Sequence, residues 1–238
     1  MRGGNGASVP VLAEFPAGRW GDLSKRILSA LVMAPVALAC VWLGGTAFVV
    51  VVAVAMIGLA VEWLSLCRRS GWAPLRPIGL AYVALAGAAL LWLRNDPDTG
   101  RADVVFLLVV VWAGDIGAYL IGRWIGGPRL APGISPGKTW SGAIGALLAA
   151  VAAGLLAAHF LSNAASWRAV VIAAVLDVVA QGGDLLESFV KRRLEVKDSG
   201  QLIPGHGGLF DRLDGVLAAA PAAALLALAL GRGVVLWQ

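Results

Sequence analysis

The sequence is poor in charged residues, cysteine and histidine. Asp, Glu, Lys and Arg make up 14% of its 238 residues, against about 25% in an ordinary soluble domain. The two cysteines, Cys40 and Cys67, lie in or beside apolar segments, which excludes a disulfide framework and a cysteine-rich metal site. The two histidines, His159 and His206, are too far apart in the sequence for a zinc motif. A GxSxG sequence, typical of an acyl-transfer nucleophile, is also missing.

Apolar sequence dominates instead. Hydrophobic residues make up 59% of the chain, and the mean hydropathy is +0.82. The apolar runs are continuous rather than alternating, which favours helices over a β-barrel, and each helix needs roughly 20 mainly apolar residues. We therefore expect an all-α polytopic membrane protein with about seven transmembrane helices, near residues 27–43, 47–66, 78–93, 104–122, 141–161, 169–187 and 214–231. Residues 1–24 are predicted to form a cytoplasmic N-terminal tail, and residues 25–238 a single transmembrane catalytic domain.

The basic residues predict the orientation of these helices. With the N-terminus inside, 15 Lys and Arg fall in inner segments and 4 in outer segments, and basic loops remain in the cytoplasm. This split places the polar segments 123–140 and 188–213 on the cytoplasmic side, as in a protein of the bacterial inner membrane. The formal net charge of +5 then indicates affinity for anionic lipid rather than for nucleic acid.

Ionisable side chains are concentrated in one stretch, Ser188 to Asp214. Its Pro and Gly residues argue against a continuous helix, so we expect a loop there. Glycine-rich backbone can present N–H groups to phosphate oxygens, and carboxylates can hold a divalent cation that the same oxygens bind. The charged members are the cations Lys191, Arg192, Arg193, Lys197 and Arg212 and the acids Glu195, Asp198, Asp211 and Asp214.

Acidic residues also lie inside the predicted spans, where a charge needs a partner or a function. Asp177, Asp184 and Glu187 share one face of the sixth predicted helix. They could form structural ion pairs with the basic loop, or they could belong to a site. For Asp184 the site is favoured, because the preceding Gly182 and Gly183 would let a helix or a ligand approach its backbone.

Four further acids lie in or at the start of predicted spans. Asp211 and Asp214 are three residues apart at the start of the last predicted span, so they face the same way. With Asp184 they could supply oxygen ligands for Mg²⁺. Asp115, near the end of the fourth span, could equally bond a neighbouring helix. Glu62, at the end of the second span, is expected to be interfacial and to have no site function.

The segment 130–142 contains a lysine and hydroxyls directly before the fifth predicted span. Ser135, Lys138 and Thr139 could form an anion site at the helix start. Alternatively, they form an ordinary helix cap with a lysine that extends to solvent. The segment is not a P-loop, because Pro132 stands where that motif needs glycine.

Together these motifs resemble the CDP-diacylglycerol synthases, or phosphatidate cytidylyltransferases. The signature runs from Ser188 to Asp214: Ser188, Lys191-Arg192, Lys197-Asp198, Gly200, Pro204-Gly205-His206-Gly207-Gly208, Asp211-Arg212 and Asp214, with no departure. Upstream, Asp115 to Tyr119, Leu130 to Pro132, Ser135 to Trp140, Gly183 to Leu185 and Glu187-Ser188 also look like that family's motifs, in the same order. The resemblance is specific from about Asp103 onward.

The resemblance implies transfer of a cytidylyl group from CTP to phosphatidic acid, giving CDP-diacylglycerol and pyrophosphate for phospholipid biosynthesis. It implies Mg²⁺, with room for a second cation, and a homodimer in the lipid bilayer. The resemblance also implies that Asp184 and Asp211 are metal ligands, that Asp115 and Asp214 help to hold the metal, and that Lys191 and Lys197 are catalytic. The substrate-binding residues carried over are Ser135, Lys138, Thr139, Ser188, Arg192, His206, Gly207, Gly208 and Arg212.

Two other membrane functions also involve clustered or intramembrane acids. A CDP-alcohol phosphotransferase is excluded, because Asp214-Gly215 is not followed by that family's Ala-Arg pair and later aspartates. An ion- or proton-coupled transporter would use intramembrane acids such as Asp115, Asp177 and Asp184. It predicts acids near the middle of the membrane, whereas these are expected at the cytoplasmic mouth beside the basic stretch.

Overall fold

The computed structural model describes residues 34–162, 166–196, 199–200, 208–231 and 233–238. Over this part the chain is helical except for one short hairpin. The elements are α2 (Gly45–Arg69), α3 (Leu75–Arg94), α4 (Gly100–Ile125), β1 (Arg129–Ala131), β2 (Ser135–Thr139), α5 (Trp140–Ser162), α6 (Trp167–Arg193) and α7 (Phe210–Leu230). A shorter apolar helix, Ala34–Leu43, precedes α2.

The described residues contain 6 helices that are long and apolar enough to cross a membrane, α2 to α7. They confirm the predicted class of all-α polytopic membrane protein. The predicted first span, 27–43, is described only from residue 34, and the tail 1–24 lies outside the described residues. The third span, predicted near residues 78–93, corresponds to α3, which has 20 residues and begins three residues earlier, at Leu75.

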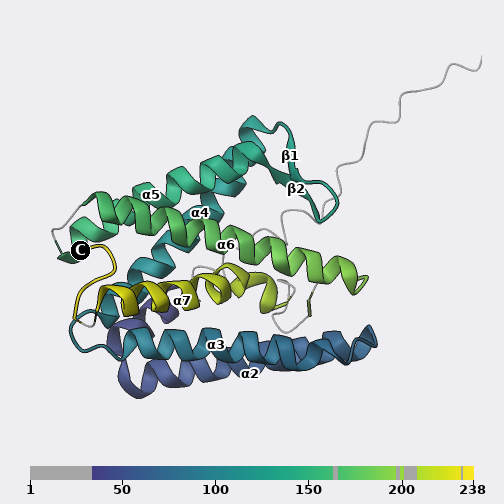
Figure 1. Cartoon of the computed structure of the whole chain (residues 1–238), viewed down its shortest axis with the longest axis horizontal. Coiled ribbons are helices and arrows are strands. Elements are labelled where there is room, and N and C mark those ends of the chain that lie inside the picture. The colour runs from purple at the N-terminus through teal and green to yellow at the C-terminus, as the bar shows by residue number, and fades with distance from the viewer. Residues whose placement is uncertain (1–33, 163–165, 197–198, 201–207, 232) are drawn as a thin grey trace, which may run out of the picture.

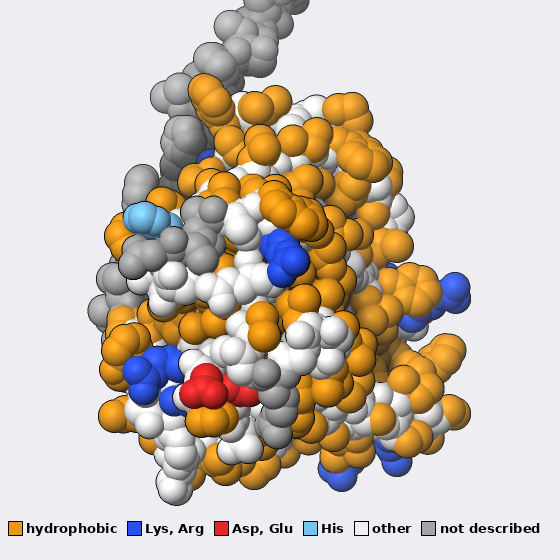
Figure 2. Space-filling view, turned by 60° about the vertical axis from the view of Figure 1, so that its left-hand side comes forward, with side chains coloured by type: hydrophobic (Ala, Val, Ile, Leu, Met, Phe, Trp, Pro, Cys, Tyr) orange, Lys and Arg blue, Asp and Glu red, His pale blue; other side chains and the backbone are white. Residues whose placement is uncertain are grey.

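Helices α2, α3, α7, α6 and α5 contact one another in that order, and α4 packs mainly against α5 and also touches α3, α6 and α7 (Figure 1). Because neighbours in the chain run antiparallel, the C-terminal ends of α2 and α6 and the N-terminal ends of α3 and α7 meet at one end of the bundle. The β1–β2 hairpin lies near the same end, whereas the C-terminus of the chain lies at the other. Hydrophobic side chains cover most of the face in Figure 2, as expected for a surface in contact with lipid.

Small residues allow the helices to approach closely. A Cβ at Gly117 of α4 would lie 2.6 Å from the carbonyl oxygen of Gly145 in α5. A Cβ at Gly183 of α6 would lie 2.8 Å from the carbonyl oxygen of Asp214 in α7. Such contacts drive helix association where lipid removes the usual hydrophobic force. The expectation that Gly183 permits close approach of a helix is confirmed.

The prediction of a loop over residues 188–213 was wrong at both ends, where α6 and α7 extend into this segment. Helix α6 continues to Arg193, and α7 begins at Phe210, so the basic residues before 194 and the pair Asp211–Arg212 are helical. A helix C-terminus favours cations and an N-terminus favours anions. The last turn of α6 is basic, and the first turn of α7 contains Asp211, as this rule predicts. Lys197, Asp198 and residues 201–207, with the glycines and proline that argue against a helix, lie outside the described residues.

The opposite end of the bundle is closed by the C-terminal segment. Asp103 of α4 is 2% exposed and accepts a hydrogen bond from the backbone N–H of Leu236 at 2.9 Å. The ring of Trp237 stacks on Phe106 with centroids 4.6 Å apart, and its N–H donates to Ser162. These contacts attach the chain end to α4 and α5, far from the hairpin.

Candidate active site

A polar cavity of about 640 Å³ opens between the hairpin and helices α4, α5, α6 and α7. Its volume lies within the range of pockets that hold small ligands. Cations and acids line it together, which is the arrangement expected for a polyphosphate with a metal ion. The charged lining residues are Arg123, Arg129, Lys138, Lys191 and Arg212 and the acids Asp115, Asp184, Glu187, Asp211 and Asp214.

Three of the acids come close enough to share a cation. One carboxylate oxygen from each of Asp184, Glu187 and Asp214 lies within 4.8 Å of the others. Glu187 is only 9% exposed, and its Oε1 has no hydrogen-bond partner within the described part of the chain. An orphaned, buried carboxylate oxygen is costly unless something else satisfies it. The donor set therefore fits a hard cation such as Mg²⁺, which prefers oxygen ligands.

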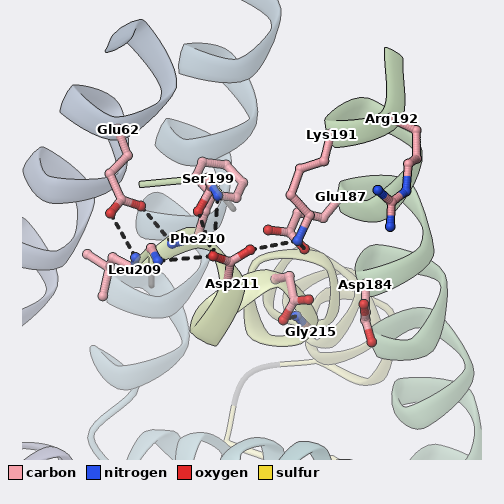
Figure 3. A network of polar contacts seen from close by, with 12 residues as sticks. Glu62, Asp184, Glu187, Lys191, Arg192, Ser199, Leu209, Phe210, Asp211 and Gly215 are labelled. Carbon is pink, nitrogen blue, oxygen red and sulfur yellow. Dashed lines mark hydrogen bonds and ion pairs between the residues drawn. The ribbon is translucent and has the colours of Figure 1, made fainter. Parts of the chain in front are cut away.

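Asp211 lies beside this group and is held by several donors (Figure 3). Its Oδ1 accepts the Lys191 ammonium at 2.6 Å. Its Oδ2 accepts the hydroxyl of Ser199 at 3.1 Å and the backbone N–H of Gly208 at 3.0 Å. Lys191 also pairs with Glu187 at 2.9 Å, so one lysine joins Asp211 to the acid group.

The hairpin brings a second lysine to the site. Lys138 Nζ lies 2.5 Å from Asp184 Oδ2, and both side chains remain partly accessible. The next residue, Thr139, is buried, and its hydroxyl accepts the backbone N–H of Gly142 at 3.1 Å. Thr139 thus bonds an otherwise unsatisfied N–H in the first turn of α5, as the helix-cap alternative predicted. Lys138 instead lines the cavity.

The remaining predicted residues fall in three groups. Asp115 lines the cavity from α4, and Arg212 lines it from α7. Ser135 and Ser188 are described but do not line it, and Arg192 is exposed and donates from Nε to the carbonyl of Ile134 at 3.3 Å. Lys197, His206 and Gly207 lie outside the described residues. Gly208 is described, and it is buried against Asp211.

The predicted row of acids on α6 divides into two parts. Asp184 and Glu187 line the cavity. Asp177 is buried one to two turns away and accepts a hydrogen bond from Gln181 at 2.6 Å. One oxygen of Glu187 forms the kind of structural ion pair that was the alternative to a site, and its partner is Lys191 on the same helix.

Sequence reasoning missed three residues near the site. Arg123 and Arg129 line the cavity, although the sequence showed them only as basic loop residues. Glu62 was expected to have no site function, but its side chain is 3% exposed and accepts two backbone N–H groups at the start of α7. The available signal was an acid inside an apolar run, which is costly without a partner.

A second cavity adjoins the first and is apolar. It has a volume of about 210 Å³ and lies between α2, α3, α6 and α7. Its walls are mainly Trp63, Leu66, Ile78, Leu186 and Val190. Glu187, Lys191 and Asp214 line both cavities. An apolar compartment therefore meets a charged one at the same side chains.

Comparison with known proteins identifies the class of this helical membrane protein. Residues 72–230 match the model of the Cytidylyltransferase family, and the chain belongs to that family. The matched region includes every residue that lines the charged cavity. It also includes the residues that line the apolar cavity, apart from Trp63 and Leu66 of α2.

Three similar proteins have the same name. A phosphatidate cytidylyltransferase from Brucella suis biovar 1 (strain 1330) is 39% identical over an alignment 245 residues long including gaps, and the alignment covers 84% of this chain and 91% of that protein. One from Rickettsia felis (strain ATCC VR-1525 / URRWXCal2) is 33% identical over 210 residues, covering 84% and 90%. One from Mycobacterium leprae (strain TN) is 45% identical over 124 residues, covering 52% and 40%.

Proposed function

We propose that this protein transfers the cytidylyl group of CTP to phosphatidic acid in the membrane, forming CDP-diacylglycerol. The observation that carries the proposal is the meeting of a charged cavity with an apolar one at Glu187, Lys191 and Asp214. A reaction between a polar nucleotide and a lipid phosphate needs such a junction. The names of the similar bacterial proteins support the same reaction.

In this reaction an oxygen of the phosphatidate phosphate forms a bond to the α-phosphorus of CTP. The bond from that phosphorus to the oxygen bridging to the β-phosphorus breaks, and pyrophosphate leaves with its electron pair. A phosphate monoester is largely ionised near neutral pH, since its second pKa is about 6. A general base is therefore not needed, and positioning and charge neutralisation supply the catalysis.

The cations of the cavity perform that neutralisation. Lys138, Arg123 and Arg129 extend from the hairpin side and would bind triphosphate oxygens. Lys191 stands where the two cavities join, so its ammonium would bring the lipid phosphate towards the nucleotide. Apolar walls such as Leu186 and Val190 would receive the glycerol and the first acyl carbons.

Mg²⁺ is the metal that the acids suit. Asp184, Glu187 and Asp214 would hold it, with Asp211 beside them and Asp115 across the cavity. When bound, it would offset the charge of the triphosphate and of the leaving pyrophosphate. The ligand pair expected from the sequence, Asp184 with Asp211, and a second cation remain part of this proposal.

We further propose that the cavity faces the cytoplasm in a bacterial inner membrane and that the protein works as a homodimer. The orientation rests on the 15 to 4 distribution of basic residues and on their concentration at the cavity end of the bundle. CTP is a cytoplasmic nucleotide, which agrees with this side. The homodimer rests on the family resemblance alone. The alternative of a transporter gains no support, because Asp184 and Asp115 share one cavity with five cations.

The test uses purified full-length protein in phosphatidate mixed micelles. With Mg²⁺ and CTP we expect CDP-diacylglycerol, and we expect none when phosphatidate is omitted or when the metal is chelated. Replacing phosphatidate by diacylglycerol, which lacks the attacking phosphate, serves as the matched control. A folded protein that forms no lipid-linked nucleotide with any nucleoside triphosphate would contradict the proposal.

A further inference from the structure

Glu62 of α2 contacts the start of α7 across a large distance in the sequence. Its carboxylate accepts the backbone N–H of Leu209 at 2.9 Å and that of Phe210 at 3.0 Å (Figure 3). The side chain is 3% exposed. Backbone N–H groups at a helix start have no partner within the helix, and the helix dipole favours a negative charge there.

Among the described residues, the segment that leads into helix α7 supplies no side-chain cap at Leu209. Leu209 occupies its N-cap position and makes no side-chain hydrogen bond to the helix. An aliphatic side chain cannot accept one, unlike the Ser, Thr, Asp or Asn usually found there. Glu62 therefore supplies from a different helix the acceptor that the local sequence lacks.

We propose that Glu62 is a positioning residue for the reaction: by holding the first N–H groups of α7 it sets the location of Asp211. The expected effect on catalysis rests on the proposed function, whereas the contact between Glu62 and the start of α7 is independent of that function. Asp211 follows Phe210 directly, so a displacement of the Leu209–Phe210 backbone moves its carboxylate. That carboxylate binds Lys191 at 2.6 Å, and Lys191 stands at the junction of the two cavities.

The backbone around Glu62 is arranged to enclose its carboxylate. A Cβ at Gly200 would lie 2.6 Å from Glu62 Oε1, and a Cβ at Gly208 would lie 3.0 Å from Glu62 Oε2. The same segments serve Asp211, through the N–H of Gly208 and the hydroxyl of Ser199. The carboxylates of Glu62 and Asp211 thus both contact the backbone segments at residues 199–200 and 208–210.

Trp63, the next residue in α2, strengthens the connection. Its ring lies 5.9 Å from that of Phe210, centroid to centroid. Its indole N–H donates to the carbonyl of Leu75 at 3.1 Å, at the start of α3. The end of α2 is therefore attached to both α3 and α7, and Glu62 projects from a fixed position.

The test compares Glu62→Ala and Glu62→Gln with a matched control, Asp103→Ala. Asp103 is also a buried acid that accepts a distant backbone N–H, but it lies at the other end of the bundle. Three quantities are measured on full-length protein: thermal unfolding, amide hydrogen exchange, and the KM and kcat for cytidylyl transfer. Exchange reports the contact without depending on activity.

For Glu62→Ala we expect faster exchange confined to residues 208–212 and a fall in kcat of about 10- to 100-fold, as for a displacement of reacting groups by roughly 1 Å. Glu62→Gln keeps one acceptor oxygen but places an amide NH2 group against the second backbone N–H, so it should recover only part of both losses. Asp103→Ala should lower the unfolding temperature and leave kcat near that of the wild type.

Two results would overturn the inference. The first is unchanged exchange at residues 208–212 in Glu62→Ala, which would show that the contact does not hold the helix start. The second is a faster local exchange with an unchanged kcat, which would show that the contact does not position the site. If the wild type itself lacks cytidylyl transfer, the proposed function fails, and the exchange result still decides the structural part.

Discussion

Substituting Gly183 by alanine tests whether the spacing of α6 and α7 sets the geometry of the acid group. The added Cβ would lie 2.5 Å from the Cβ of Ala218 and 2.8 Å from the carbonyl oxygen of Asp214. Ordinary contacts between carbon atoms are about 3.5–4.0 Å, so the helices must separate by roughly 1 Å. That separation acts directly on Asp184 and Asp214, which are adjacent to the contact.

The expected effect on activity is larger than that on stability. Overpacking costs about 1–3 kcal/mol, and alanine in place of glycine within a helix returns up to about 1 kcal/mol. The protein should therefore fold with a small loss of stability. A displacement of about 1 Å at reacting groups can lower the rate about 100-fold. We expect a fall in kcat between roughly 10- and 100-fold.

Gly182→Ala is the matched control, because a Cβ at Gly182 has nothing within 4 Å. It makes the same chemical change at the adjacent position of the same helix. The assay is CDP-diacylglycerol formation in phosphatidate mixed micelles at saturating substrates, with thermal unfolding measured on the same samples. If both variants retain wild-type kcat, the reasoning about helix spacing is refuted.

Substitutions at four further residues test the site. Asp184→Asn or Asp211→Asn should lower turnover at least about 100-fold while the protein still folds, because Asp184 is a proposed Mg²⁺ ligand and Asp211 holds Lys191. Near-normal turnover in both variants would remove these two residues from the metal and phosphate site. Thr139→Ala should cost about 1 kcal/mol of stability through loss of the α5 cap, and Thr139→Ser should restore it; equal unfolding temperatures for the two variants would speak against the cap. Val190→Trp should fill the apolar cavity and raise the KM for phosphatidate but not for CTP, and a matching rise in both would disconnect that cavity from the lipid.

The membrane helices could be predicted from sequence because continuous apolar runs leave few alternatives in lipid. The limits of α6 and α7 were harder. The charged residues Lys191 and Asp211 look like loop residues by composition, yet they lie in the last turns of α6 and the first turn of α7. Charges that match the helix dipole are tolerated at helix ends, so polarity alone does not mark where a helix stops.

The partners of the site residues could not be predicted. Nothing in the spacing of Lys138 and Asp184 reveals that a hairpin brings them to 2.5 Å. Glu62 and Leu209 are 147 residues apart, and their contact depends on how α2 and the start of α7 both pack around α3. Local pattern gives the faces and lengths of helices, whereas such pairs depend on tertiary packing.

The measurement that tests the central claim most directly follows two labels of CTP, one at the α-phosphate and one at the γ-phosphate, during turnover with phosphatidate. The account predicts that the α-label enters the lipid phase and that the γ-label remains in water as pyrophosphate. Entry of the α-label into lipid and release of labelled pyrophosphate should both stop in Asp184→Asn. Label at the γ-position in the lipid, or an α-label that stays in water while the folded wild type consumes CTP, would contradict cytidylyl transfer at this site.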